Sequence, residues 1–498
     1  MKKVYDLGID VGTTGTKALI MDAKGVVRAT ATWPHRLSMP RPSWSEQSPE
    51  QWWKSTKKAI RSVINSAGID GKSIAAIGLT GQMHGLVCLD EKGNVLRPAI
   101  IWNDQRSAKE ADLIERTVGG KSALIKMVGN IAVISFTLTK LLWVRRHEPR
   151  VYRKIRHILL PKDYVRFRLT DMYAGDVSDM SGTLMLNQRK RNWSSEIINK
   201  FDIDKEILPP VYESHEITGR ITAQAARQTG LYAGTPVVAG AGDQPAGAVG
   251  LGIVKPGLVS AALGTSGVVF THLDRYITDP AGRLQTFCSA VADEYCMFGC
   301  ILSAGGSLEW LSRTLQDDYK SLDAQARRAR VGCNGLFFLP YLTGERTPHF
   351  DALARGSWVG ITAKSTRAEL IRSVMEGVVF AMNDALTILR ERGIKPRQIR
   401  LSGGGARSAL WRKIQSNVYG TNCATLRTEQ GPAYGAAILA AVGVGQFNSV
   451  KQACDKIIKI TDTIKPDTRT ARMYLRYYGQ YRRLYPALKD EFPRISKL

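Results

Sequence analysis

Short apolar runs alternate with glycine-containing turns along much of this chain. The first run, Val4–Val11, is interrupted by two acids, and after the turn Gly12–Lys17 a second run covers residues 18–22. This order predicts two antiparallel strands whose connecting turn exposes N–H groups and hydroxyls that can bind phosphate. The turn is not a Walker A loop, because the required spacing is absent and a strand, not a helix, follows. An ordinary polar hairpin is the alternative.

The same strand–turn–strand pattern recurs half a chain later. Gly264–Gly267 lies between the apolar runs 258–263 and 268–270, and its offset from Gly12 is 264 − 12 = 252 of the 498 residues. Such a repeat, in a chain too long for one ordinary core, predicts a duplicated domain. We therefore expect an α/β protein with domains 1–244 and 245–498. Facing hairpins could hold one triphosphate, with Asp10 as a partner for Mg²⁺.

Asp243 stands where a buried strand is predicted to end and a helix to begin. Residues 237–239 are small and apolar, two glycines follow, and Pro245 suits the first turn of a helix over 246–249. Open α/β sheets form ligand clefts at such junctions. A carboxylate there is a candidate general base for a substrate hydroxyl. A plain helix N-cap is the alternative, since Asp is among the preferred caps.

Two further strand ends carry polar groups suited to a polyol. The buried run 74–80 leads into Gln82, Met83 and His84, and the run 98–101 leads into Trp102 and Asp104. Amide, imidazole and carboxylate groups offer donors and acceptors, and methionine offers an adaptable apolar wall. We expect a sugar-binding rim here. The alternatives are a structural histidine and a turn with an exposed tryptophan.

Glycine turns in the second half predict a site for a flat or anionic ligand. Gly305 opens a turn that leads into a helix, and Gly403–Gly405 follows the short strand 399–402. Glycines let such a ligand approach the backbone closely. The G-x-G-x-x-G pattern is not met, so a dinucleotide fold is not indicated. A long helix is predicted between these turns, over residues 367–391.

A net charge of +26 is the unusual feature of the composition, and it raises the question of a nucleic-acid partner. Lys451–Leu498 alone carries twelve basic against five acidic residues. Four tyrosines in this stretch follow steps of four, three and four, which places them on one helical face. We expect that face to pack inward while the arginines meet water, which makes nucleic-acid binding improbable. These tyrosines are Tyr474, Tyr478, Tyr481 and Tyr485.

The cysteines and the apolar runs indicate a cytoplasmic protein. Seven cysteines contain no C-x-x-C pair, which fits reduced thiols better than disulfides or a zinc site. The first residues hold no signal-peptide run, and no stretch approaches the ~18 apolar residues that a membrane helix needs.

Two long stretches of fixed spacing, residues 135–147 and 356–376, resemble the signatures of the FGGY carbohydrate kinases. Within that family, Trp44–Gln47, Gln82–Gly85, Leu160–Tyr164 and Gly344–His349 look like segments of bacterial xylulokinases. The resemblance covers nearly the whole chain, from Asp10 to about Glu491.

The resemblance implies two ribonuclease-H-like (actin-like) domains with an active site between them, and ATP and Mg²⁺ as cofactors. The expected reaction is phosphorylation of a small-molecule sugar, a ketopentose such as D-xylulose, with Asp243 as catalytic base. A homodimer is expected by analogy only. The remaining expected site residues are Gln82, Met83, His84, Asp104 and Gln244 for the sugar, Gly12, Thr13, Thr14, Lys17, Gly264, Thr265, Ser266, Gly305, Gly404 and Gly405 for the nucleotide, and Asp10 for the metal.

One departure bears on the choice of sugar. Xylulokinases usually carry Asn after the catalytic Asp, whereas this chain carries Gln244, as glycerol kinases do. An extra methylene in a contact can shift substrate preference by roughly 10–200-fold. The loop 131–139 also differs from the usual pattern. Another ketose or polyol (ribulose, L-xylulose, deoxyxylulose), or a non-catalytic sensor of ATP and sugar, are the alternatives.

Overall fold

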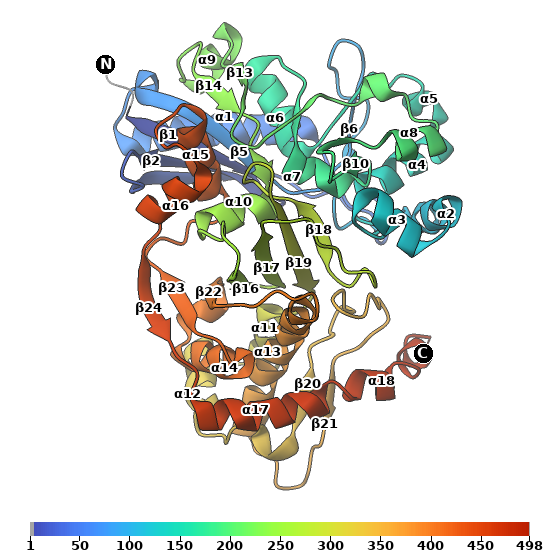
Figure 1. Ribbon diagram of the computed structural model, residues 1–498, viewed down its shortest axis with the longest axis vertical. Coiled ribbons are helices and arrows are strands. Elements are labelled where there is room, and N and C mark those ends of the chain that lie inside the picture. Colours follow the sequence, from blue (N-terminus) through green and yellow to red (C-terminus); the bar gives the residue numbers. More distant parts are fainter. Residues whose placement is uncertain (1–3, 498) are drawn as a thin grey trace.

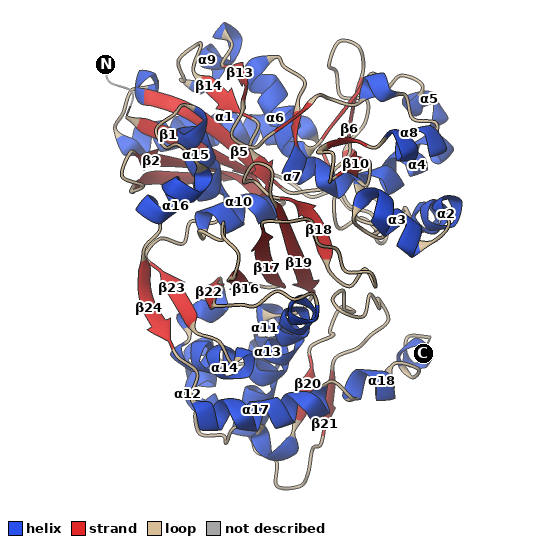
Figure 2. Ribbon diagram, in the orientation of Figure 1, coloured by secondary structure: helices blue, strands red, loops and turns tan. Residues whose placement is uncertain are grey.

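The computed structural model describes residues 4–497, which form two α/β domains arranged one above the other (Figure 1). Each domain contains a seven-stranded mixed sheet with helices packed against it (Figure 2). The predicted boundary between residues 244 and 245 falls inside a helix, Asp243–Gly250. The exact limits of the two domains stay a prediction.

The N-terminal sheet has the order β13-β14-β5-β1-β2-β3, with the short β15 also paired to β5. The predicted hairpin is its centre: β1 and β2 pair antiparallel, with Asp10 opposite Lys17. β5 runs parallel to β1, so both strands deliver their carboxyl ends to the same edge. The strands are β1 (Tyr5–Val11), β2 (Gly15–Asp22), β3 (Val27–Pro34), β5 (Ile74–Gly81), β13 (Ile217–Arg220), β14 (Pro236–Val238) and β15 (Ala241–Gly242).

The C-terminal sheet, ordered β18-β19-β17-β16-β22-β23-β24, repeats this plan. Its hairpin β16–β17 is antiparallel, and β22 runs parallel to β16 as β5 does to β1. The duplication predicted from the two turns therefore appears in the topology. The strands are β16 (Leu258–Leu263), β17 (Gly267–Leu273), β18 (Gln285–Cys288), β19 (Tyr295–Ile301), β22 (Gln398–Ser402), β23 (Cys423–Leu426) and β24 (Ile460–Ile464).

Helices and short strand pairs complete the N-terminal domain. The pairs are β4 (Glu46–Gln47) with β7 (Ala99–Ile100), β6 (Val87–Leu89) with β8 (His157–Leu159), β9 (Gly175–Asp176) with β12 (Val211–Tyr212), and β10 (Leu186–Asn187) with β11 (Asn192–Trp193). The helices are α1 (Pro49–Ala67), α2 (Ala108–Val118), α3 (Lys121–Val128), α4 (Thr137–His147), α5 (Pro149–Tyr152), α6 (Pro161–Thr170), α7 (Val177–Met180), α8 (Ser195–Lys200), α9 (Ala223–Thr229) and α10 (Asp243–Gly250).

The long helix predicted over residues 367–391 is confirmed as α13, and it crosses the core of the C-terminal domain. A capping box at Thr366 and Glu369 fixes its start. The other helices are α11 (Gly305–Leu315), α12 (Tyr319–Ala326), α14 (Ala409–Tyr419), α15 (Pro432–Gly443), α16 (Val450–Ile457), α17 (Thr468–Tyr481), α18 (Leu484–Leu488) and α19 (Phe492–Ile495), with the strand pair β20 (Phe337–Leu339) and β21 (Ser357–Val359).

Helix α15 connects the two halves of the chain, because it returns from the C-terminal half to pack on the N-terminal sheet beside α10 (Figure 1). The approach depends on glycine. A Cβ built on Gly8 in β1 would lie 1.8 Å from the carbonyl oxygen of Ala433, and one on Gly78 in β5 would lie 2.0 Å from that of Ala436. Larger residues at either glycine would push the helix off the sheet.

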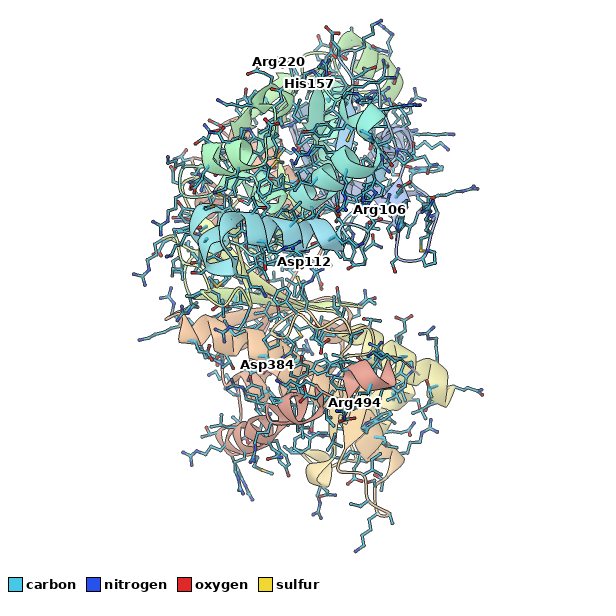
Figure 3. The ribbon with its side chains drawn as sticks, turned by 90° about the vertical axis from the view of Figure 1, so that its right-hand side faces the viewer. Arg106, Asp112, His157, Arg220, Asp384 and Arg494 are labelled. Atoms are coloured by element: carbon cyan, nitrogen blue, oxygen red, sulfur yellow. The ribbon has the colours of Figure 1, made fainter. Side chains whose placement is uncertain are left out.

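Helix α17 buries the predicted tyrosine face. Tyr474, Tyr478 and Tyr481 are buried in the C-terminal core, whereas Tyr485 follows in α18 and is partly exposed. The hydroxyl of Tyr478 donates to Asp384, which is labelled in the lower domain in Figure 3. This inward packing explains the interleaved arginines as the solvent face of an amphipathic helix.

Candidate active site

Asp243 lies at the end of the N-terminal sheet, where β15 passes into α10. Gly242, not Asp243, occupies the N-cap position of α10, and Asp243 is the first helical residue, so the N-cap alternative is wrong. The Asp243 carboxylate therefore does not cap the helix, and it receives hydrogen bonds from the neighbouring Gln244. Protein surrounds it on nearly all sides although part of its surface stays accessible. This burial, aided by the charge of Asp10, raises the pKa of Asp243 to about 7.

A cavity of about 430 Å³ opens in front of Asp243, between the two domains. Three residues predicted to contact sugar line it together with Asp243: Met83, His84 and Gln244. Trp102 lines it too, and its indole N–H donates to the Thr13 hydroxyl at 2.9 Å, which agrees with a rim role for the tryptophan. The cavity therefore combines a half-buried carboxylate with amide, imidazole and apolar walls, as a small polar ligand requires.

His84 is held rigidly at the wall of this cavity. Its Nδ1 lies 3.1 Å from the carbonyl oxygen of Gly182, and its ring packs between Phe136 and Phe287. Burial, with the charge of Lys140, lowers its pKa well below the usual value, so the imidazole is neutral. A carbonyl partner places the proton on Nδ1, which leaves Nε2 as an acceptor for a sugar hydroxyl.

Gln82 and Asp104 take positions that the sequence did not predict. Gln82 is buried and donates to the Gln47 side chain at 2.7 Å, which ties the end of β5 to β4. Asp104 is fully buried, and its carboxylate accepts from the backbone N–H of Ser45 and from the guanidinium of Arg106, which is labelled in Figure 3. Neither residue lines the cavity in front of Asp243.

A second cavity of about 830 Å³ lies within the C-terminal domain. The second hairpin turn and both glycine turns meet there. Gly305 donates its N–H to the carbonyl of Gly264 at 2.7 Å, and a Cβ built on Gly403 would lie 2.6 Å from the carbonyl oxygen of Leu263. Five residues predicted for the nucleotide line this cavity: Gly264, Thr265, Gly305, Gly404 and Gly405. Ser266 lines the cavity at Asp243 instead, so the turn lies between the two.

The first hairpin faces the Asp243 cavity from the N-terminal domain. Thr13 lines that cavity, and Gly12 and Thr14 flank it in the same turn. Lys17 reaches across to the C-terminal half, where its ammonium group donates to the carbonyl and side-chain oxygens of Gln430, both at 2.9 Å. The hairpin is therefore tied to the opposite domain.

The sequence matches family models over both halves. Residues 5–250 match the N-terminal domain and residues 259–444 the C-terminal domain of the FGGY family of carbohydrate kinases. The chain belongs to the FGGY family. It is therefore a sugar kinase, and membership implies ATP as the phosphoryl donor.

Relatives along the full length include xylulose kinases. The chain is 39% identical to the xylulose kinase of Escherichia coli (97% of this chain, 99% of that protein) and 36% identical to that of Bacillus subtilis (98% and 97%). Among solved structures, a kinase from Brucella ovis titled xyloylose kinase superposes with a TM-score of 0.92 at 37% identity, covering 98% of this chain and 99% of that one. A gluconate kinase from Lactobacillus acidophilus reaches 0.94 at 27%, covering 99% of each. The FGGY fold alone thus does not fix the sugar.

Asp10 fits the metal role expected in an FGGY kinase. Its Oδ1 is buried without a hydrogen-bond partner, and burial, opposed by Lys17, raises its pKa to about 6. Within residues 4–497 no cluster of three or more His, Cys, Asp or Glu could hold a metal. A Mg²⁺ ion would therefore take most of its ligands from nucleotide phosphates and water, with Asp10 supplying a carboxylate.

Sequence reasoning missed the contribution of the C-terminal domain to the Asp243 cavity. Gln285 comes from the edge strand β18, Phe298 from its neighbour β19, and Arg346 from the polar loop after β20. That loop was recognisable from its Gly344–His349 motif, but nothing local connected it to Asp243. Among the described residues, all seven cysteines are free, and no helix is long and apolar enough to cross a membrane.

Proposed function

We propose that this chain transfers the γ-phosphoryl group of Mg²⁺-ATP to the terminal hydroxyl of D-xylulose, giving D-xylulose 5-phosphate. The observation that carries the proposal is Asp243, a half-buried carboxylate at a strand–helix junction, in one cavity with Met83, His84 and Gln244. The names of the full-length relatives support the choice of sugar.

Asp243 accepts the proton of the attacking hydroxyl in this proposal. A base with a pKa of about 7 is ionised in half of the molecules at neutral pH and still binds a proton well enough to take it from the hydroxyl. His84, with Nε2 free as an acceptor, orients a second hydroxyl of the sugar. The apolar walls Met83 and Phe298 exclude water that would otherwise compete as acceptor.

The nucleotide lies in the C-terminal cavity, with its phosphates directed past the turn at Ser266 toward Asp243. The backbone N–H groups of the two hairpin turns stabilise phosphate oxygens, as Gly-rich turns do. Asp10 would help to hold a Mg²⁺ ion, which when bound would supply positive charge to the phosphoryl oxygens. Lys17, which bridges to Gln430, draws the two domains together around the reacting groups.

The test is coupled ADP release with Mg²⁺-ATP across D-xylulose, D-ribulose, L-xylulose, 1-deoxy-D-xylulose, gluconate and glycerol. We expect the wild type to prefer D-xylulose, and we expect Asp243→Ala to lower kcat for that sugar by ~10²–10⁴-fold. Gln244 beside the base is the reason to include other acceptors, because it lines this cavity and an extra methylene in a contact can shift substrate preference. Preference for another sugar would keep the mechanism and change the substrate. ATP binding without turnover on any acceptor would favour a sensor, and normal turnover by Asp243→Ala would refute the base.

A further inference from the structure

A buried segment of the N-terminal domain contacts both ends of the sugar site. Residues 176–183 contain α7 and the one-turn helix η2 (Ser181–Thr183), and their polar side chains are almost completely inaccessible to water. One end of this segment binds the backbone before Asp243, and the other end binds the ring of His84. Neither the family signatures nor the local sequence pattern assigns it a role in the reaction.

The contact before Asp243 is made by the hydroxyl of Ser178. The backbone N–H of Gly242 donates to Ser178 Oγ at 3.2 Å, and Ser178 Oγ donates to Asp176 Oδ1 at 2.5 Å. The single hydroxyl proton is used on the carboxylate, so the hydroxyl oxygen is directed at Gly242. Because Gly242 caps α10, this bond sets the direction of the first helical residue, Asp243.

Asp176 is itself immobilised. The same Oδ1 accepts from the backbone N–H groups of Ser178 and Asp179, at 2.8 and 3.1 Å, as the N-cap of α7. Its other oxygen lies 2.7 Å from the ammonium group of Lys162 in an ion pair that is wholly inside the protein. Buried charges of this kind are costly to separate, so the pair fixes Asp176 and, through it, the Ser178 hydroxyl.

The opposite end of the segment fixes His84. The Gly182 carbonyl lies 3.1 Å from His84 Nδ1, and the ring packs so closely that a Cβ on Gly182 would lie 2.4 Å from that nitrogen. One short helical segment therefore sets the separation between the carboxylate that takes the proton and the imidazole that holds the sugar.

We propose that Ser178 is a positioning residue: its hydroxyl holds Gly242, and thereby the Asp243 carboxylate, in the geometry that accepts the proton of the sugar hydroxyl. This inference rests on the proposed function, in which Asp243 is the base. Ser178 does not touch the substrate, so its removal affects the reaction only through Asp243.

The variants are Ser178→Ala and Ser178→Cys, with Ser214→Ala as matched control. Ser214 is equally buried and its hydroxyl also donates to Asp176 Oδ1, at 3.5 Å, but it has no bond to Gly242. The cysteine variant nearly conserves volume and replaces the hydroxyl by a weak acceptor, so it keeps the test valid if the alanine variant does not fold. Thermal unfolding confirms that each variant is folded before kinetics are measured.

We expect both Ser178 variants to lower kcat by about 10- to 100-fold, since a displacement of about 1 Å costs that much in catalysis. The KM values for sugar and ATP should stay within about twofold of the wild type, because neither ligand loses a contact. Ser214→Ala should keep kcat within about twofold. A Ser178→Ala or Ser178→Cys enzyme with the kinetics of the Ser214→Ala control overturns the proposal.

A double-mutant cycle with Asp243→Asn separates this proposal from the proposed function. If Ser178 acts through Asp243, then Ser178→Ala should lower kcat by less than about twofold in the Asp243→Asn background. Equal losses in both backgrounds would refute the positioning role while leaving Asp243 as the base. An Asp243→Asn enzyme with wild-type turnover would instead refute the base, and the positioning role with it.

Discussion

Replacing Gly182 with alanine tests how firmly His84, the imidazole proposed to bind the sugar, must be held. The backbone of Gly182 lies outside the left-handed region, so alanine fits its conformation, and the effect comes from the added methyl group alone. That Cβ would lie 2.4 Å from Nδ1 and 2.5 Å from Cε1 of His84. Ordinary contacts need about 3.5 Å, so the ring must retreat by about 1 Å.

The ring has little freedom to do so. His84 has a φ of 70°, which is unusual for a non-glycine residue, and its ring centroid lies 4.8 Å from that of Phe136 and 6.1 Å from that of Phe287. Retreat would break the bond from Nδ1 to the carbonyl and displace Nε2 from the sugar hydroxyl. We expect kcat/KM for the acceptor sugar to fall by about 10- to 100-fold, with the loss chiefly in KM.

The assay is coupled ADP release with the acceptor sugar varied at saturating ATP, and then with ATP varied at saturating sugar. The KM for ATP should stay within about twofold, because the cavity proposed for the nucleotide lies in the C-terminal domain, away from His84. Gly479→Ala is the control: it lies in α17 with no atom within 4 Å of the added Cβ, so its kinetics should match the wild type. A Gly182→Ala enzyme with an unchanged KM for sugar would show that the reasoning about His84 is wrong.

Three further predictions concern pH and stability. Burial and the charge of Asp10 raise the pKa of Asp243 to about 7, so kcat/KM should rise about tenfold per pH unit below 7 and level off above it. The Asp243 carboxyl titrates near pH 3.8 in the unfolded chain and near 7 in the folded protein, so its contribution to stability is complete below pH 3.8 and is lost as the pH rises through about 7. In thermal unfolding, Asp243→Asn should therefore gain more stability over the wild type at pH 8 than at pH 5. Tyr474→Phe removes hydrogen bonds to buried Glu376 (2.7 Å) and Arg372 (3.0 Å), and denaturant unfolding should show a loss of about 1–3 kcal/mol with unchanged kinetics. The hydroxyl of Tyr477 has no hydrogen bond among the described residues, so Tyr477→Phe should change neither the stability nor the kinetics. Equal losses of stability in the two variants would contradict this prediction.

The sequence by itself determined the features that depend on neighbouring residues. The two hairpins, the long helix at 367–391 and the buried tyrosine face follow from hydrophobic period and turn chemistry, which are local. The placement of Asp243 between strand and helix belongs to the same class, and the repeat of one turn after 252 residues predicted the duplicated domain. These patterns can be recognised in the sequence because each helix or strand buries its apolar residues, and the spacing of those residues follows the period of the element.

Only the tertiary structure decided which distant residues meet. Gln82 donates a hydrogen bond to Gln47, and Asp104 accepts one from Arg106, because buried polar groups need hydrogen-bond partners within the folded protein. Arg346 lines the Asp243 cavity from the opposite domain, and α15 packs back on the first sheet. Ser178 met the backbone before Asp243 from 64 residues away. No local pattern encodes such contacts, since they depend on how two independently formed layers pack.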